Sequence, residues 1–99
     1  MTVCGAPPQG RDLAGVDLST ETVIQGQVVR DGSPVGSAYV RLLDAGGEFT
    51  AEVQSSADGY FRFFAAPGRW TLRVLSAGDR GEHSLDADRG LNEAQLRLT

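Results

Sequence analysis

The stretch DGYFRFFAAPGRWTLRVL, residues 58–75, decides the fold that we predict for this chain. Asp58-Gly59 and Pro67-Gly68 are turn dipeptides, and each precedes a run whose composition favours a strand. The first run, residues 60–64, holds four of the aromatic side chains. The second run, residues 70–74, alternates apolar and polar side chains, which is the period of a strand with one face in water. We therefore expect a hairpin here, with the rest of the core packed against it.

Working outward from this hairpin, turn residues separate further runs with strand character, and no stretch of useful length has helical periodicity. A single helical turn is possible at residues 17–21. Together with the central hairpin, the runs predict an all-β, antiparallel β-sandwich of about seven strands. The further strands are expected at residues 22–30, 35–44, 48–55, 82–87 and 91–99, with a polar break at residues 76–81. The expected core consists of Ile24, Val28, Ala38, Val40, Leu42, Val53, Phe61, Phe63, Trp70, Leu72, Val74 and Leu96.

Composition limits the function classes. A chain of 99 residues is the size of one domain. The formal net charge is −4, and all nine basic residues are scattered arginines, which argues against nucleic-acid binding. One cysteine excludes an internal disulfide, and the sequence has neither a signal peptide nor a run long enough to span a membrane. We expect a cytoplasmic protein with no membrane contact.

The expected domain organisation has two parts. Residues 1–21 begin with a segment rich in Gly, Pro and Ala, and we interpret them as a flexible N-terminal tail that carries Cys4. Residues 22–99 hold every expected strand and form the β-sandwich domain.

The order of motifs resembles a known domain type. GQV at residues 26–28, DGSPV at 31–35, AYVRL at 38–42, DGYFRF at 58–63 and PGRWTLRV at 67–74 follow one another. In this order they resemble the carboxypeptidase regulatory-like domains. That resemblance implies a transthyretin-like, prealbumin-type β-sandwich with an immunoglobulin-like architecture.

Longer strings resemble a narrower group. ETVIQGQVV, YVRLLDAGGEFTAEV and FRFFAAPGRWTLRVLSA, with one Cys beside Gly in a short N-terminal tail, are similar to a small actinobacterial family of unknown function. That family is associated with sulfur metabolism and is encoded beside rhodanese-type thiosulfate sulfurtransferases. The resemblance therefore implies a sulfurtransferase as a candidate partner.

Two related groups differ from this chain in residues that their chemistry needs. Transthyretin-like hydrolases of the urate pathway use several His residues and a C-terminal Tyr-Arg-Gly-Ser run, whereas this chain has one His and ends in QLRLT. Pilin-type sandwiches of Gram-positive surface proteins form isopeptide bonds through Lys, which this chain lacks. Neither chemistry is therefore expected here.

Cys4 is the candidate thiol. An accessible cysteine in a flexible tail could accept sulfane sulfur or pair with a partner protein. The nearest cation in sequence is Arg11, so the sequence offers no obvious means of lowering the thiol pKa. The alternative interpretation is an inert thiol in a tail.

A second candidate is a partner-docking surface, because Tyr and Arg are common anchors of protein interfaces. Alternation on the expected strands allows Tyr39, Arg41, Tyr60, Arg62 and Arg73 to share one outer sheet face. The alternative is an ordinary solvated face.

Catalytic and metal sites find little support. His83 has Ser84 and Asp86 nearby in sequence, but adjacency on one strand does not supply the convergence that a catalytic triad needs. No ligand pair has zinc spacing, and the Asp-Gly turns lack the alternating carboxylates of a calcium loop. We predict a non-enzymatic protein without a metal or cofactor.

Two functions remain open. The first is an accessory or sulfur-carrier protein of thiosulfate and sulfane-sulfur metabolism that uses Cys4. The second is a structural or ligand-binding β-sandwich module that acts through its sheet face without thiol chemistry.

Overall fold

The computed structural model describes residues 17–98, which form eight strands. Residues 1–16 of the predicted tail, which was expected at residues 1–21, lie outside the described residues. The strands are β1 (Thr22–Arg30), β2 (Ser33–Pro34), β3 (Tyr39–Leu43), β4 (Phe49–Gln54), β5 (Tyr60–Ala65), β6 (Gly68–Ser76), β7 (Asp79–Ala87) and β8 (Gly90–Arg97).

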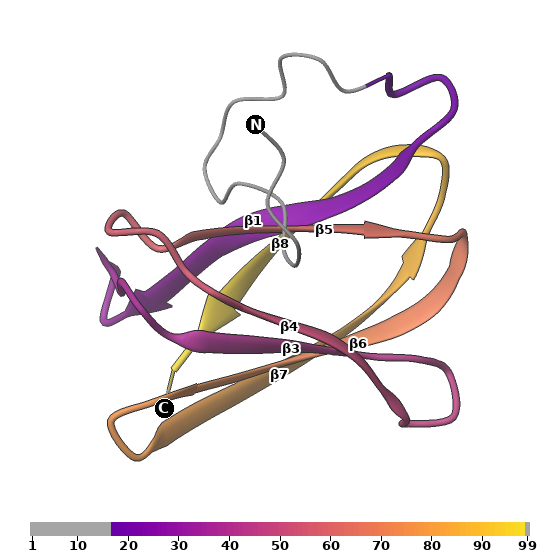
Figure 1. Ribbon diagram of the computed structural model, residues 1–99. Coiled ribbons are helices and arrows are strands. Elements are labelled where there is room, and N and C mark those ends of the chain that lie inside the picture. The colour runs from indigo at the N-terminus through magenta and orange to yellow at the C-terminus, as the bar shows by residue number, and fades with distance from the viewer. Residues whose placement is uncertain (1–16, 99) are drawn as a thin grey trace, which may run out of the picture.

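The strands form two layers (Figure 1). In the first sheet, β1 lies between β5 and β8, and the short β2 pairs with the end of β1. The second sheet has the order β4-β3-β6-β7. The expectation of an all-β sandwich is confirmed, with one addition: β1 and β8 pair in parallel from Thr22 opposite Gly90 to Val29 opposite Arg97.

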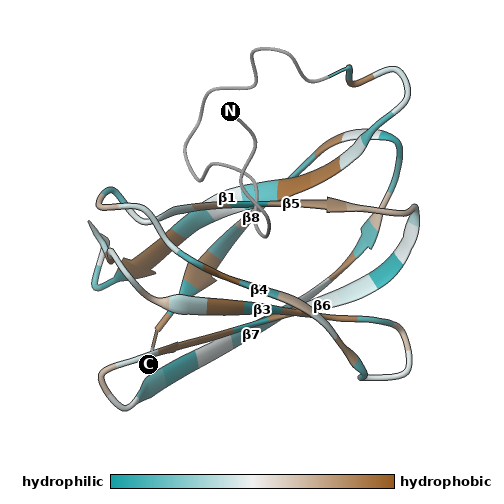
Figure 2. Ribbon diagram, in the orientation of Figure 1, coloured by the Kyte–Doolittle hydropathy of each residue, from teal (hydrophilic) through white to brown (hydrophobic). Residues whose placement is uncertain are grey.

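The core lies between the two sheets, whose strands contribute its buried apolar side chains. Hydrophobic and hydrophilic residues alternate along several of these strands (Figure 2). The rings of Phe61 and Phe63, from the first sheet, are 6.2 Å apart between centroids. They belong to the same buried cluster as Leu42 and Leu72 from the second sheet. Every predicted core residue is buried except Trp70, which is partly exposed and donates its indole N–H to the Ala66 carbonyl at 2.8 Å.

The predicted polar break at residues 76–81 is wrong, because most of it belongs to a hairpin. Ala77 and Gly78 both have positive φ, 50° and 85°, as a two-residue turn between antiparallel strands requires. Ser76 therefore pairs with Asp79, and β7 starts three residues before the run predicted from Glu82. The sequence also did not indicate the two-residue strand β2, because its residues lie in the turn expected between residues 30 and 35.

Two glycines allow backbones to approach closely. A Cβ at Gly26 of β1 would collide with the Ala94 carbonyl of β8 and lie 3.1 Å from the Phe61 ring. A Cβ at Gly81 of β7 would collide with the Arg97 carbonyl of β8. Gly81 thus lies where the second sheet approaches the edge of the first.

A single turn leads into β1, as the sequence predicted. The Glu21 amide donates to the Asp17 carbonyl at 2.8 Å, and the Ser19 amide donates to the Asp17 carboxylate at 2.9 Å. The Ser19 hydroxyl donates to the same carboxylate. The hydrogen bonds from the Ser19 hydroxyl and amide lower the pKa of Asp17 below its ordinary value.

Candidate functional site

The structure divides the predicted docking residues between the two sheets. Tyr39, Arg41 and Arg73 lie together on the outer face of the second sheet, whereas Tyr60 and Arg62 belong to β5 of the first sheet. The expectation of one shared face is therefore wrong for Tyr60 and Arg62. The chain passes from the second sheet to the first between β4 and β5. Alternation of side chains within a strand does not indicate which sheet the strand joins. Cys4 lies outside the described residues.

The centre of the outer face of the second sheet is a row of four charged side chains in register. Arg41 of β3 lies opposite Arg73 of β6, and each arginine lies opposite a glutamate on its other side, Glu52 of β4 and Glu82 of β7. We call these four residues the arginine row. Each of the two central cations is paired with its own carboxylate, which offsets the repulsion between the neighbouring arginines.

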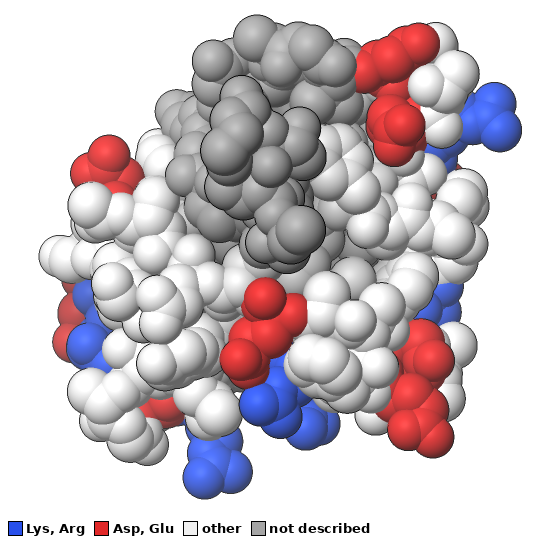
Figure 3. Space-filling view, viewed as in Figure 1, with Lys and Arg blue, Asp and Glu red and all other residues white. Residues whose placement is uncertain are grey.

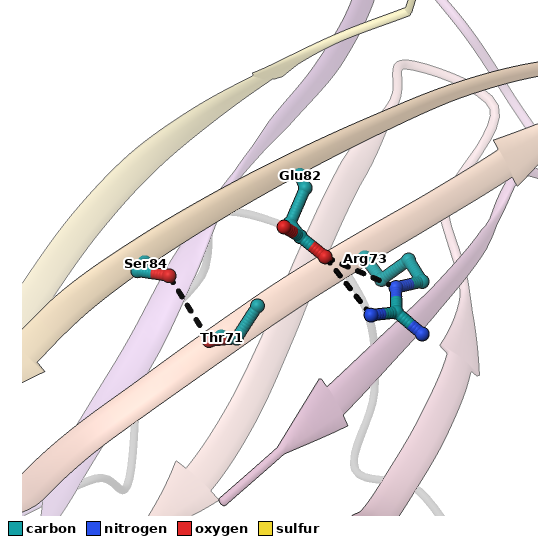
Figure 4. A network of polar contacts seen from close by, with 4 residues as sticks. All are labelled: Thr71, Arg73, Glu82 and Ser84. Atoms are coloured by element: carbon teal, nitrogen blue, oxygen red, sulfur yellow. Dashed lines mark hydrogen bonds and ion pairs between the residues drawn. The ribbon is translucent and has the colours of Figure 1, made fainter. Parts of the chain in front are cut away.

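Each ion pair has the same geometry. Arg41 donates from Nε and one terminal nitrogen to a single Glu52 oxygen, at 3.1 and 3.0 Å. Arg73 donates in the same way to Glu82, again at 3.1 and 3.0 Å, and Figure 4 shows the second Glu82 oxygen turned away from the arginine. Beside this pair, the Thr71 and Ser84 hydroxyls lie 3.0 Å apart (Figure 4). The guanidinium groups are thus held in place on an exposed face.

Three large apolar side chains flank the arginine row. Tyr39 and Leu75 lie opposite each other on one side, with 49% and 40% of their surfaces exposed. Phe49 lies on the other side with 60% exposed, and its ring centroid is 5.5 Å from the Arg41 guanidinium carbon. This distance suits a cation–π contact. The face therefore combines oriented cations with exposed apolar surface, the combination found in interface anchors.

Plain alternation along β4, from Val53 through Ala51, predicts Phe49 on the apolar inner face, and its outward position is a correction. A β-bulge between Leu42 and Leu43 makes Phe49 pair with Leu43 and leaves Thr50 out of register. An extra residue in one strand reverses the side chains that follow it. A plain alternation of residues in sequence gives no sign of this bulge.

Two shallow pockets lie beside the row. One, of about 420 Å³, is lined by Arg73, Leu75, Arg80, Gly81 and Glu82. The other, of about 360 Å³, runs from Tyr39 past the β6–β7 turn and shares Leu75 and Arg80 with the first. Across the visible surface, acidic and basic side chains lie next to one another (Figure 3). The second sheet thus presents a face that carries both charges and lies beside two shallow pockets.

Arg62 has a different environment on the first sheet. Only 4% of its surface is exposed, and its Nε donates to the Gln25 side-chain oxygen at 3.1 Å. Gln25 itself is 7% exposed. Arg62 is therefore a buried, hydrogen-bonded residue, and the expectation that it lies on a solvent-facing docking surface is wrong.

His83 lies on β7 opposite Leu72 of β6 and is exposed. Strand alternation places it on the opposite side of β7 from Ser84 and Asp86, so these three side chains do not converge. Within residues 17–98, no group of three His, Cys, Asp or Glu side chains is arranged to hold a metal ion. In the same range, no helix has the length and apolar character needed to cross a membrane.

Comparison with protein families identifies the family of this chain. A family model described as a protein of unknown function, DUF1416, matches residues 4–98. An uncharacterized protein of Mycobacterium tuberculosis is 54% identical over 100 residues, covering 98% of this chain and all of the relative. An uncharacterized protein of Mycolicibacterium smegmatis is 53% identical over 87 residues, covering 86% of this chain and 97% of the relative.

Comparison with solved structures shows the fold. The crystal structure of S.CueP has a TM-score of 0.66 at 14% identity, and the match covers 80% of this chain and 62% of that one. BcpA, the major pilin subunit of Bacillus cereus, has a TM-score of 0.64 at 10% identity over 81% of this chain and 30% of that one. A DUF3823 family protein of Parabacteroides merdae has a TM-score of 0.61 at 17% identity over 81% of this chain and 46% of that one. This chain thus spans less than two thirds of each of these proteins.

Proposed function

We propose, from the premise that the chain belongs to the DUF1416 family of proteins of unknown function, that it is a non-enzymatic binding module. It docks a protein partner through the outer face of the second sheet. The observation that carries this proposal is the arginine row, with Arg41 and Arg73 side by side and each held by its own glutamate. We place this role in the cytoplasm.

Preorganisation is the physical reason for choosing this face. Binding costs conformational entropy whenever a long side chain must be fixed in one rotamer, and Glu52 and Glu82 already restrict the two arginines. Exposed Tyr39 and Leu75 supply apolar area beside them. A partner with acidic groups opposite the arginines and an apolar side chain between them would match this arrangement.

The resemblance of the sequence to a family associated with sulfur metabolism suggests the partner, a rhodanese-type thiosulfate sulfurtransferase. In the fuller form of the proposal, the sheet face docks the enzyme and Cys4 accepts its sulfur. The family match begins at Cys4, so the thiol belongs to the matched region. A sheet-face module without thiol chemistry is the alternative, and the arginine row supports both forms equally.

The sulfur step is a transfer between thiols with no net oxidation. The Cys4 thiolate attacks the outer sulfur of the enzyme's cysteine persulfide. A new S–S bond forms at Cys4, the enzyme's S–S bond breaks, and its cysteine leaves as a thiolate. The proton released by the Cys4 thiol is available to the leaving thiolate.

Docking is tested by calorimetric titration of the whole chain with a purified thiosulfate sulfurtransferase. Arg73→Glu should weaken binding by at least about tenfold, which corresponds to about 1.4 kcal/mol. The charge-swapped variant Arg73→Glu with Glu82→Arg keeps the ion pair and the net charge and should also bind weakly. Arg97→Glu, on the exposed outer face of the first sheet, is the matched control and should bind normally. Normal binding by both Arg73 variants would contradict docking through this face.

Sulfur transfer is tested separately by intact-mass spectrometry after incubation with the enzyme and thiosulfate. Loading of one sulfur adds about 32 Da as a persulfide, and Cys4→Ser should abolish the gain. Binding without a mass gain would favour the module without thiol chemistry. A mass gain that persists in Cys4→Ser would contradict the role of Cys4.

A further inference from the structure

The outer face of the first sheet contains a pocket of about 320 Å³ that the proposed docking role does not use. Three adjacent strands build it: β5 contributes Tyr60, β1 contributes Gln25 and Gln27, and β8 contributes Glu93 and Gln95. The backbone of β1 and β8 at Gly26 and Ala94 also lines it. Among the described residues of the pocket, the side chains are mainly polar, and Glu93 alone carries a charge.

Strand register brings the polar side chains of the pocket into two rows. Tyr60, Gln27 and Gln95 lie directly opposite one another across β5, β1 and β8. In the neighbouring row, Gln25 lies opposite Glu93. Neighbours within a row are about 4.8 Å apart, and the rows are about 6.6 Å apart along the strands. These spacings fit the substituents of one sugar ring.

Two of the amides are already oriented by hydrogen bonds. Gln27 donates from its side-chain nitrogen to the Asp58 carbonyl at 2.9 Å. The Gln25 side-chain oxygen accepts the Arg62 Nε–H at 3.1 Å. This hydrogen bond orients the Gln25 amide, so that its nitrogen points away from Arg62. Each bond uses one end of an amide that has two donors and an acceptor. Both side chains therefore keep hydrogen-bonding capacity in defined directions.

The combination of side chains indicates a class of ligand. A side-chain amide both donates and accepts, as a hydroxyl group does, and a carboxylate such as Glu93 accepts from two hydroxyls at once. The half-buried Tyr60 supplies an aromatic surface. An anionic ligand such as a phosphate would meet Glu93 and gain little from neutral amides. We propose that this pocket is a binding site for an uncharged, hydroxyl-rich ligand, namely a hexopyranose unit of a carbohydrate.

This proposal is independent of sulfurtransferase docking, and NMR titration of the ¹⁵N-labelled whole chain tests it. The probes are glucose, N-acetylglucosamine and maltose, with glycerol at equal hydroxyl concentration as the comparison. A small, shallow site should give a dissociation constant on the order of 1 mM. We expect saturable shifts at the amides of residues 25–27 and 93–95 with at least one of the sugars. No saturable shift with any of them, or a response that glycerol reproduces, would overturn the proposal.

Variants locate the site. Gln95→Ala and Gln27→Ala should each weaken sugar binding by at least about tenfold if their amides contact the ring, which corresponds to about 1.4 kcal/mol. Gln95 is exposed, so its loss should leave the fold unchanged, and the spectrum of the sugar-free variant checks this. Gln54→Ala, at an exposed glutamine of β4 in the second sheet, is the matched control and should bind sugar normally. Unchanged binding by Gln95→Ala, or equal weakening by Gln54→Ala, would contradict this site.

Discussion

The outer faces of the two sheets are built from different side chains. The second sheet exposes an ion-paired arginine row flanked by Tyr39, Leu75 and Phe49. The first sheet carries rows of amides and a tyrosine around a pocket, and Arg62 on its edge strand β5 is buried. Residues of the same type therefore have different roles in the two layers, and the layer decides which role an arginine has.

This difference shows what an arginine on an alternating strand contributes. Arg73 is exposed and paired with a carboxylate, so losing it costs little stability and mainly removes a potential contact. Arg62 is buried against an amide, so losing it leaves a polar atom without its partner inside the protein. The predictions below test this contrast, from the largest expected effect to the smallest.

The largest effect compares one aromatic from each sheet. Phe61→Ala, in the first sheet, should lower the free energy of unfolding by about 3–5 kcal/mol, because its ring is fully buried in the core. Trp70→Ala, in the second sheet, should cost less than this range, because the indole is partly exposed. Urea denaturation of both variants measures the difference. A larger loss for Trp70→Ala would show that the second sheet contributes the more important half of the core.

The next effect concerns two glycines that lie close to the backbone of β8, Gly26 within the first sheet and Gly81 in the second. Gly26→Ala and Gly81→Ala each place a Cβ against a backbone carbonyl of β8, and each should destabilise by about 1–3 kcal/mol. Gly46→Ala is the control, because its Cβ meets only the Asp44 side chain at 3.4 Å and its φ is not positive. Thermal unfolding provides the comparison. Equal melting temperatures for all three variants would contradict the close approaches.

A smaller effect tests the two arginines directly. Arg62→Met should lower the free energy of unfolding by about 1–3 kcal/mol, because the buried Gln25 oxygen loses its donor. Arg73→Met should change it by about 0–1 kcal/mol, because its ion pair is exposed. Chemical denaturation in low and high salt tests Arg73 further, since its exposed ion pair should weaken when salt screens the two charges. A larger loss of unfolding free energy for Arg73→Met than for Arg62→Met would contradict the proposed difference between the two faces.

The smallest effect lies outside both sheets, at the turn before β1. Hydrogen bonds from Ser19 lower the pKa of Asp17, so the charged carboxylate is favoured in the folded protein. Its contribution to stability is therefore present above the pKa of the unfolded chain and is lost as pH falls through the lower, folded-state pKa. Ser19→Ala should raise the Asp17 pKa, as measured by NMR titration of its side-chain carbons. An unchanged value would show that Ser19 does not hold this carboxylate.

Much of the fold could be predicted from short-range patterns. Alternation located the core positions of β1, β3 and β5, and turn dipeptides located most strand ends. The parallel pairing of β1 with β8 could not be predicted, because it joins segments that are remote in sequence. The bulge at Leu42 escaped prediction for a related reason: it depends on the partner strand.

The candidate site was predicted less well than the fold. The predicted arginines and tyrosines lie on the side of their strands that faces away from the core, although Arg62 is buried there, and nothing in the sequence indicates which sheet each strand joins. Tyr39, Arg41 and Arg73 lie together because β3 and β6 are neighbours in the second sheet. Tyr60 and Arg62 lie apart from them because β5 belongs to the first sheet. The pairing of each arginine with a glutamate, and the amide rows around Gln27, emerge only from strand register. Cys4 stays a prediction.

The most direct test of docking through the second sheet is amide chemical-shift mapping. The ¹⁵N-labelled whole chain is titrated with an unlabelled thiosulfate sulfurtransferase, and the shifts of the two faces are compared. Docking through the second sheet predicts the largest changes at Tyr39, Arg41 and Arg73, with Gln25 and Glu93 unaffected. Changes confined to the first sheet, or no change at saturating enzyme, would contradict it.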